Sequence, residues 1–192
     1  MNLRELPAKK TVKLLTLVLT SLLIASVSAA VYYSMFMEPK VTISAADVYF
    51  VAGGDSTAAG ATGYGTNGTW VRLASLKAYP NATLTYDEAI NITNGGSGWH
   101  EIRLRHSSIS PNGTADVANF TSITFKLIAP NGTQCGGDFS YTVTGNNWNA
   151  PSDMAYQGIP AGEEWAVKVE TLAVSGALAD ISVEIDIILD VR

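Results

Sequence analysis

Apolar residues form one long run near the start of the chain and short alternating patterns after it. The run covers residues 14–37 and reads LLTLVLTSLLIASVSAAVYYSMFM. After residue 38, apolar and polar residues alternate over short segments separated by Gly, Asn and Pro, which is typical of half-buried strands. Helical periodicity does not appear in this second part of the sequence. The pattern therefore predicts an apolar N-terminal segment followed by an all-β body.

The apolar run itself divides into two parts. Its first part follows three lysines and ends in the small residues 27–30, which is the order of an export signal with its cleavage site. Its second part, residues 31–37, is rich in aromatic and β-branched residues, which favour an extended strand. The predicted division is a signal peptide over residues 1–30, an extended strand over 31–38 and a β-sandwich domain over 39–192.

A single uncleaved membrane helix is the alternative interpretation of this run. Residues 14–37 number 24, and about 20 apolar residues suffice to cross a bilayer. The small residues before position 31 and the aromatic residues after it favour cleavage. Pro39 also ends the run, because proline cannot continue a helix. We therefore expect contact with the membrane only in the uncleaved precursor.

The body is predicted to contain roughly eight or nine strands with turn residues between them. The segments that carry the strand pattern are 41–51, 70–78, 82–93, 99–106, 120–128, 139–144, 162–171 and 178–192. Short strands joined by Gly, Asn and Pro turns indicate a single antiparallel β-sandwich, similar to a jelly roll.

Two stretches lack a strand pattern and are expected to be loops. Residues 53–69 are small, polar and rich in glycine, but their glycines match neither nucleotide-binding motif. Residues 146–160 are irregular, and we expect Trp148 and Tyr156 to anchor this loop on the core, with a carbohydrate contact as the alternative.

Composition and charge of the body favour an extracellular location. Of 12 basic and 17 acidic residues, four basic and one acidic residue lie in the predicted signal, which leaves 8 and 16, a net charge of −8. Such a surface repels phosphate groups and has no basic stripe, so a nucleic-acid partner is not expected. An acidic surface rich in Thr, Ser, Asn and Gly suits a soluble extracellular protein.

Cys135 is the only cysteine, so no disulfide can form within one chain. We expect it to be a small buried apolar side chain, and a disulfide between two chains is the alternative. The stability of the body must then come from packing, hydrogen bonds and assembly.

Combinations of side chains that would support catalysis were not found in the sequence. His100 and His106 are the only histidines and have no cysteine partners at zinc-site spacing. The serines at 107, 108 and 110 lack the G-x-S-x-G context of a nucleophile. Adjacent carboxylates, as at residues 87–88 and 163–164, point to opposite faces of a strand. The sequence therefore predicts neither an enzyme nor a cofactor.

The last predicted strand places four carboxylates on one face, at Asp180, Glu184, Asp186 and Asp190. Carboxylate oxygens are ligands for Ca²⁺, but residues two apart along a strand are separated by about 6.6 Å. We interpret the row as a charged outer face, and a calcium ion held with the help of loops remains the alternative.

Six asparagines lie in the N-x-Thr sequence that accepts N-linked glycans, all between residues 67 and 133. They are Asn67, Asn81, Asn91, Asn112, Asn119 and Asn131. Glycans are added to exported chains, so the cluster indicates an extracellular glycoprotein. The alternative is that Asn-Gly-Thr is simply favourable in turns.

Three features together resemble a known family. These are the signal with its apolar mature N-terminus, the motif EAINITNGGSGWHEIRLR and the motif IPAGEEWAVKVET. The chain resembles the camelysin/TasA-type β-sandwich proteins and, more closely, the archaeal bundling pilins, over about residues 31–191. It differs from the bacterial members in its glycosylation sequences and in lacking an acidic residue directly after the first aromatic pair.

The resemblance implies a structural subunit of an extracellular filament that mediates adhesion or bundling between cells. In that family, the N-terminal strand of one subunit completes the sandwich of the next, which is called donor-strand complementation. The residues that match the donor strand in position are Val31, Tyr32, Tyr33, Ser34, Met35, Phe36 and Met37. Its expected partners are copies of the same chain, neighbouring filaments and cell surfaces.

The residues themselves support assembly, because adding an apolar strand to an open sheet edge covers both its side chains and unpaired backbone groups. Two alternatives remain. One is a type IV pilin-like subunit in which residues 14–37 stay helical, although no Gly or Ala follows Lys10 directly as a cleavage point. The other is a membrane-anchored carbohydrate-binding domain that uses Trp70, Trp99 or Trp148.

Overall fold

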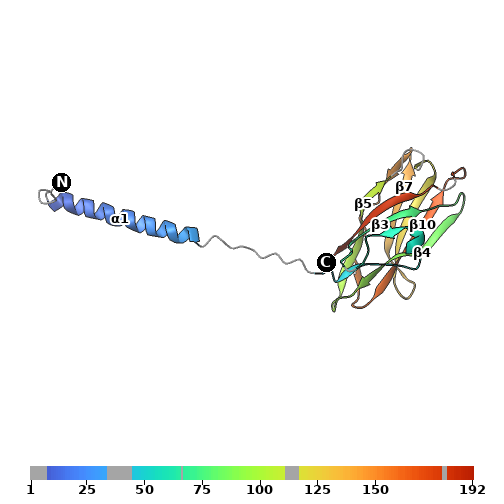
Figure 1. The fold of residues 1–192 in the computed structure, drawn as a ribbon, viewed down its shortest axis with the longest axis horizontal. Helices are drawn as coiled ribbons and strands as arrows, with labels where there is room; N and C mark the ends of the chain where they lie inside the picture. Colours follow the sequence, from blue (N-terminus) through green and yellow to red (C-terminus); the bar gives the residue numbers. More distant parts are fainter. Residues whose placement is uncertain (1–7, 34–44, 66, 111–116, 179–180) are drawn as a thin grey trace. The chain divides into compact units, whose positions relative to one another are not determined.

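The computed structural model describes residues 8–33, 45–65, 67–110, 117–178 and 181–192. The chain divides into two compact units, Met1–Ile43 and Ser44–Arg192 (Figure 1).

The first unit contains helix α1, Ala8–Tyr33. This segment has no glycine or proline, and the hydroxyls of Thr16 and Thr20 bond back to carbonyls in the preceding turn. Apolar side chains such as Leu15 and Leu17 are more than 60% exposed. No helix in the described part of the chain is both long and apolar enough to cross a bilayer.

The predicted extended strand is therefore not seen in this unit. Val31, Tyr32 and Tyr33 are the last residues of α1, and Ser34–Met37 lie outside the described residues. The physical reason is that a strand needs a neighbour for its backbone groups, whereas a helix satisfies these groups internally. The predicted signal peptide over residues 1–30 overlaps the same helix and stays a prediction.

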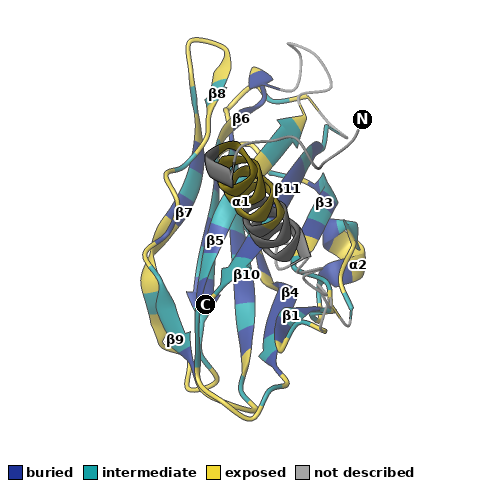
Figure 2. Ribbon diagram, turned by 90° about the vertical axis from the view of Figure 1, so that its left-hand side faces the viewer, coloured by how far each residue is buried: buried dark blue, intermediate teal, exposed yellow. Residues whose placement is uncertain are grey.

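The second unit consists of two antiparallel sheets that pack face to face (Figure 2). The six-stranded sheet has the order β1 (Val48–Val51), β4 (Thr83–Asn94), β10 (Glu164–Ala173), β6 (Phe120–Ile128), β7 (Gln134–Thr144), β8 (Asn147–Asn149). The five-stranded sheet has the order β2 (Ala61–Thr62), β3 (Trp70–Leu76), β11 (Val183–Val191), β5 (His100–Ser110), β9 (Gln157–Ile159). The prediction of an all-β sandwich is confirmed.

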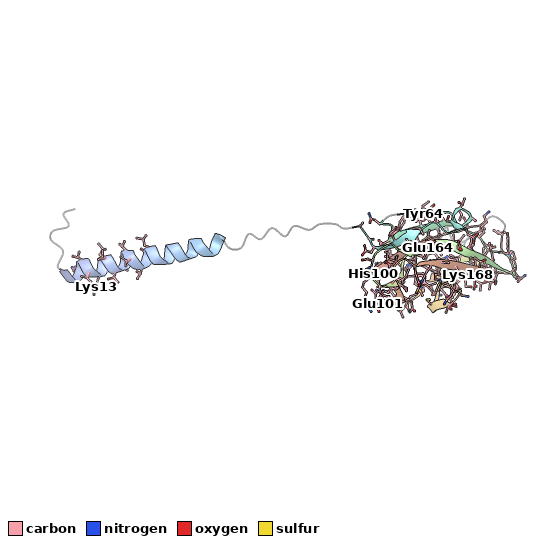
Figure 3. All side chains as sticks on the ribbon, turned by 90° about the horizontal axis from the view of Figure 1, so that it is seen from below. Lys13, Tyr64, His100, Glu101, Glu164 and Lys168 are labelled. Atoms are coloured by element: carbon pink, nitrogen blue, oxygen red, sulfur yellow. The ribbon has the colours of Figure 1, made fainter. Side chains whose placement is uncertain are left out.

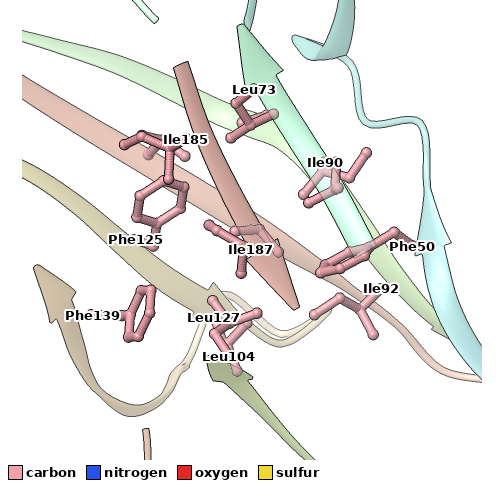
Figure 4. Packing of buried hydrophobic residues seen from close by; sticks show 14 of the residues in the cluster. Phe50, Leu73, Ile90, Ile92, Leu104, Phe125, Leu127, Phe139, Ile185 and Ile187 are labelled. Carbon is pink, nitrogen blue, oxygen red and sulfur yellow. The ribbon is translucent and has the colours of Figure 1, made fainter. Parts of the chain in front are cut away.

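Period-2 alternation determines which side chains enter the core. In β6, Ile123, Phe125 and Leu127 are fully buried, whereas the residues between them are half-buried on the outer face. Figure 4 shows Phe125 and Phe139 of the six-stranded sheet meeting Leu104 and Ile187 of the five-stranded sheet. The rings of Phe125, Phe139 and Tyr141 pack edge to face, with centroids about 6 Å apart.

Two predicted loops contain regular structure that the sequence pattern did not indicate. Residues 53–69 include β2 and a one-turn helix, α2 (Ser56–Ala59). This helix ends at Gly60, which has φ 66° and lies so close to Ser75 that a Cβ would come within 2.9 Å of the Ser75 backbone nitrogen. Residues 146–160 include β8 and β9, each only three residues long. Elements this short give no periodic signal.

We expect Phe125→Ala to lower the free energy of unfolding by about 3–5 kcal/mol, because it leaves a cavity between the sheets. The matched control is Thr85→Ala on the exposed face of β4, which should change it by less than about 0.5 kcal/mol. Urea unfolding followed by tryptophan fluorescence measures both values. Similar losses for the two variants would contradict the assigned core.

Candidate functional site

The two lateral sides of the sandwich, where the edges of its sheets face each other, are closed in different ways. On the side formed by β3 and β4, the chain around α2 bonds to both strands. The Asp55 amide donates to the Glu88 carbonyl at 3.0 Å, and the Ala74 amide donates to the Gly60 carbonyl at 3.2 Å. This side is closed by backbone hydrogen bonds to each sheet.

The opposite side, between β5 and β7, is less completely paired. One edge of β5 pairs with β11 along its length, but on the other edge β9 covers only His100–Ile102. For the rest of that edge, Arg103–Ser110, one backbone hydrogen bond is found among the described residues, from the Met154 amide to the Leu104 carbonyl at 3.2 Å. We call Arg103–Ser110 the free edge of β5.

Strand β7 borders the same side from the six-stranded sheet. Its outer edge pairs with β8 only at Thr142–Thr144. At its other end β7 approaches β9, where a Cβ on Gly136 would lie 3.1 Å from the Gln157 side chain, and Gly136 has φ 76°. Figure 2 shows β7 along one border of the sandwich, with β8 at one end and β9 at the other.

Residues 150–156 run through the gap between β5 and β7, and we call them the 150–156 segment. Met154 is its one fully buried member, 7% exposed, and belongs to the core. Asp153 contacts Arg103 of β5 at 3.2 Å. A pocket of 440 Å³ lies between this segment and Gly137, Asp138 and Ser140 of β7. The segment fills the gap with little regular pairing.

One side-chain contact links the two sheets beside this gap. The Nδ1 atom of His106 in β5 lies 3.0 Å from the hydroxyl of Tyr141 in β7, and the two rings pack edge to face. Burial raises the pKa of the Tyr141 hydroxyl, so this group stays neutral and bonds to the imidazole. Among the residues that the structure describes, the β5 edge on this side has few backbone partners and borders the apolar core, so a further strand could pair with it.

The acidic row of β11 lies on the outer face of the five-stranded sheet, where arginines neutralise it. Asp186 accepts two hydrogen bonds from Arg72, at 2.8 and 3.0 Å, and one from Ser108 at 2.9 Å. These bonds, the one from Arg72 first, hold the pKa of Asp186 below its usual range against the effect of burial.

The next carboxylate of the row behaves in the same way. Burial would raise the pKa of Asp190, but hydrogen bonds from Arg105 and Arg103 lower it below its usual value. Glu184 contacts Arg72 at 3.3 Å, and Asp180 lies outside the described residues. Among the residues with described positions, no three side chains of His, Cys, Asp or Glu are grouped so that they could hold a metal ion.

The lowered pKa of Asp186 predicts a pH dependence. A carboxylate with a depressed folded pKa contributes stability above its unfolded value of about 3.9, and this is lost as pH falls through the folded value. Between about pH 5 and pH 2, the free energy of unfolding should fall more steeply for wild type than for Asp186→Asn. Urea unfolding at several pH values tests this, with exposed Asp138→Asn expected to follow wild type. Parallel curves for wild type and Asp186→Asn would contradict the prediction.

The six predicted glycan acceptors fall into three groups. Asn67, Asn81 and Asn131 are exposed in turns. Asn91 is 8% exposed and donates its amide nitrogen, the atom that carries a glycan, to Glu164 at 2.8 Å. Asn119 is 6% exposed and accepts a hydrogen bond from the Leu178 amide. Asn112 lies outside the described residues.

We expect an exported chain to carry glycans at the exposed acceptors and not at Asn91. Asn81→Gln should then lower the apparent mass by one glycan. Asn91→Gln should leave the mass unchanged and reduce stability, because it disturbs the bond to Glu164. Gel mobility and peptide mass spectrometry measure the first effect, and urea unfolding measures the second. A glycan on Asn91 of the folded chain would refute this assignment.

The tryptophans proposed as a carbohydrate surface are separated by the fold. Trp148, the middle residue of β8, is half-buried and packs on Phe120 at the core, as expected for a residue that anchors this loop. Trp70 is 36% exposed, and Trp99 is 60% exposed and lies against Gly158. The guanidinium groups of Arg103 and Arg192 lie over the ring of Tyr156, at 4.8 and 3.9 Å from its centre.

The remaining polar candidates have structural partners. Asp87 contacts Lys168 at 3.4 Å, whereas its neighbour Glu88 accepts a bond from the Gly54 amide, so the two carboxylates do not act as a pair. Glu164 and Lys168, labelled in Figure 3, line a 470 Å³ pocket on the outer face of the six-stranded sheet.

The two histidines and the cysteine also have ordinary surroundings. His100, also labelled in Figure 3, lies 3.4 Å from a carboxylate oxygen of Asp47, and His106 makes the contact with Tyr141 described above. Cys135 is half-buried, and burial raises the pKa of its thiol, which makes it less reactive.

Comparison with protein-family models finds no match to this chain, and comparison with curated proteins finds no relative.

Sequence reasoning missed the free edge of β5 and the role of Met154. An unpaired edge depends on which strands are neighbours, and alternation along one strand does not contain that information. One signal was present: Met154 is the one large aliphatic side chain in the irregular stretch APSDMAYQG, as expected for a loop anchored on a core.

Proposed function

We propose that the chain is a structural subunit of an extracellular filament, assembled head to tail by donor-strand complementation. The observation that carries this proposal is the free edge of β5, Arg103–Ser110, beside an apolar interior. An edge of this kind is a template for a strand from another molecule. The acidic composition and the exposed glycan acceptors support an extracellular location, and the adhesive or bundling role is what the resemblance to the bundling pilins implies.

The donor segment matches this edge in length. The free edge contains eight residues and Val31–Met37 contains seven. At about 3.3 Å per residue, both span roughly 23–26 Å. The segment of one copy could therefore pair along nearly the whole free edge of another.

Head-to-tail addition leads to a filament and not to a closed dimer. The donor lies in the N-terminal unit and the acceptor edge in the sandwich, so the two surfaces differ and each subunit offers one of each. A contact between unlike surfaces continues from copy to copy unless the rotation closes a ring. The residues support a structural and not a catalytic role, because the described carboxylates and histidines are engaged in structural contacts.

A type IV pilin-like subunit is the second candidate, and one observation favours it. Helix α1 continues through the predicted cleavage site at residues 29–30 and ends only at Tyr33. Exposed apolar side chains along it could pack against the helices of other copies. Sequencing the mature N-terminus separates the two: a start near residue 30 supports donor-strand assembly, and a start near residue 11 supports the helical alternative.

Replacing residues 31–37 by a Gly/Ser linker behind an intact signal should abolish filaments and leave a soluble or unstable monomer. The physical reason is that the linker keeps the length but lacks the apolar side chains that would enter the sandwich. Electron microscopy of producing cells measures the result, and circular dichroism of the secreted protein confirms that the sandwich is folded. Filaments that persist in this variant would exclude the proposed function.

A further inference from the structure

In the isolated subunit, the 150–156 segment already lies beside part of the β5 edge to which the proposed donor segment would pair. This segment contacts the beginning of the free edge, at Arg103 and Leu104, and places Met154 in the core. Pro151 and Tyr156 are half-buried, and Ser152, Asp153 and Ala155 are exposed, so Met154 is the one member of the segment that is buried in the core. Its contacts with β5 among the described residues are one backbone hydrogen bond, the ion pair between Asp153 and Arg103, and the contact of the Arg103 guanidinium with the Tyr156 ring.

These contacts are few for a segment that closes one side of a sandwich. The ion pair joins side chains that are 26% and 40% exposed, so water and salt weaken it. A 440 Å³ pocket separates exposed residues of the segment from Gly137 and Asp138 of β7 at the surface. A regular strand would pair more of the backbone groups of β5 and would place several side chains inward instead of one.

The donor sequence has one face suited to this position. In a strand, alternate residues point to the same side, so Val31, Tyr33, Met35 and Met37 share one face. The other face carries Ser34 between two aromatic residues. The face without a serine is the more apolar and would turn toward the core. Its third member is a methionine, the same residue type that occupies the gap in the isolated subunit.

We propose that the 150–156 segment is a displaceable plug, and that Met35 of a second copy takes the core position of Met154 when the donor strand pairs with β5. This inference rests on the proposed function. It adds that the 150–156 segment leaves the gap between β5 and β7, and that the donor face with Met35 enters it. The plug keeps the core covered before assembly and gives up its place to a strand that pairs the edge more completely.

Two adjacent charge substitutions in the donor test which face enters. Met35→Asp should abolish assembly, because it places a carboxylate between the sheets. Ser34→Asp, the matched control, should change the assembly rate by less than about twofold because its side chain points outward. Light scattering and electron microscopy of the purified chain that starts at Val31 provide the readout. Loss of assembly in Ser34→Asp with normal assembly in Met35→Asp would overturn the assigned face.

Substitutions at Met154 test displacement of the plug. Met154→Ala should accelerate assembly several-fold because it weakens the anchor, and Met154→Leu, which keeps the volume, should assemble at the wild-type rate. Because Met154→Ala could also destabilise the sandwich, hydrogen exchange measured on wild-type filaments gives an independent result. Residues 150–156 should lose protection on assembly, while residues 103–110 should gain it.

The outcomes separate the two proposals. If filaments depend on residues 31–37 but residues 150–156 stay protected in them, the plug is excluded and the proposed function stands. If the wild-type chain forms no filaments, both proposals fall. If residues 150–156 open, residues 103–110 become protected and Met154→Ala assembles faster, the displacement is supported.

Discussion

The structure depends on how the backbone groups at the edges of its two sheets find partners. A buried or half-buried amide without a partner is costly, so each edge strand must be paired, covered or kept short. The side formed by β3 and β4 meets this requirement with α2 and its flanking turns, which bond to both strands. The side between β5 and β7 meets it with short strands at either end and the loosely bonded 150–156 segment between them. The difference between the two sides is the basis of the assembly proposal.

The outer face of the five-stranded sheet illustrates how charge is used in a sandwich without an internal disulfide. β11 is the central strand of that sheet, so its outward carboxylates are flanked by β3 on one side and β5 on the other. Arginines on both neighbours bond to Asp186 and Asp190, and each carboxylate is largely removed from water. A calcium ion would have to replace these bonds. The charged row therefore has a structural explanation in the pairing of strands.

Most of the sandwich could be predicted from the sequence because period-2 alternation fixes which residues of a long strand face the core. The alternation in β6, β10 and β5 predicted buried residues such as Phe125, Val167 and Leu104. Short elements were missed for the same reason: α2, β8 and β9 are too short to show a period. The free edge of β5 could not be predicted, because strand order is a property of the assembled sheets. The acceptor sequences at Asn91 and Asn119 could be found, but not their burial.

Residues 31–33 illustrate the limit of local propensity. Aromatic and β-branched side chains favour a strand, yet in the isolated chain these residues end a helix, since no partner strand is present to bond with them. For residues 31–33, the sequence favours a strand and the isolated backbone is helical, so the two conformations compete. Binding to an open edge would supply the missing partner and shift the balance toward the strand. The disagreement between strand propensity and helical structure therefore occurs in the proposed donor segment. Disagreements of this kind are expected at functional sites.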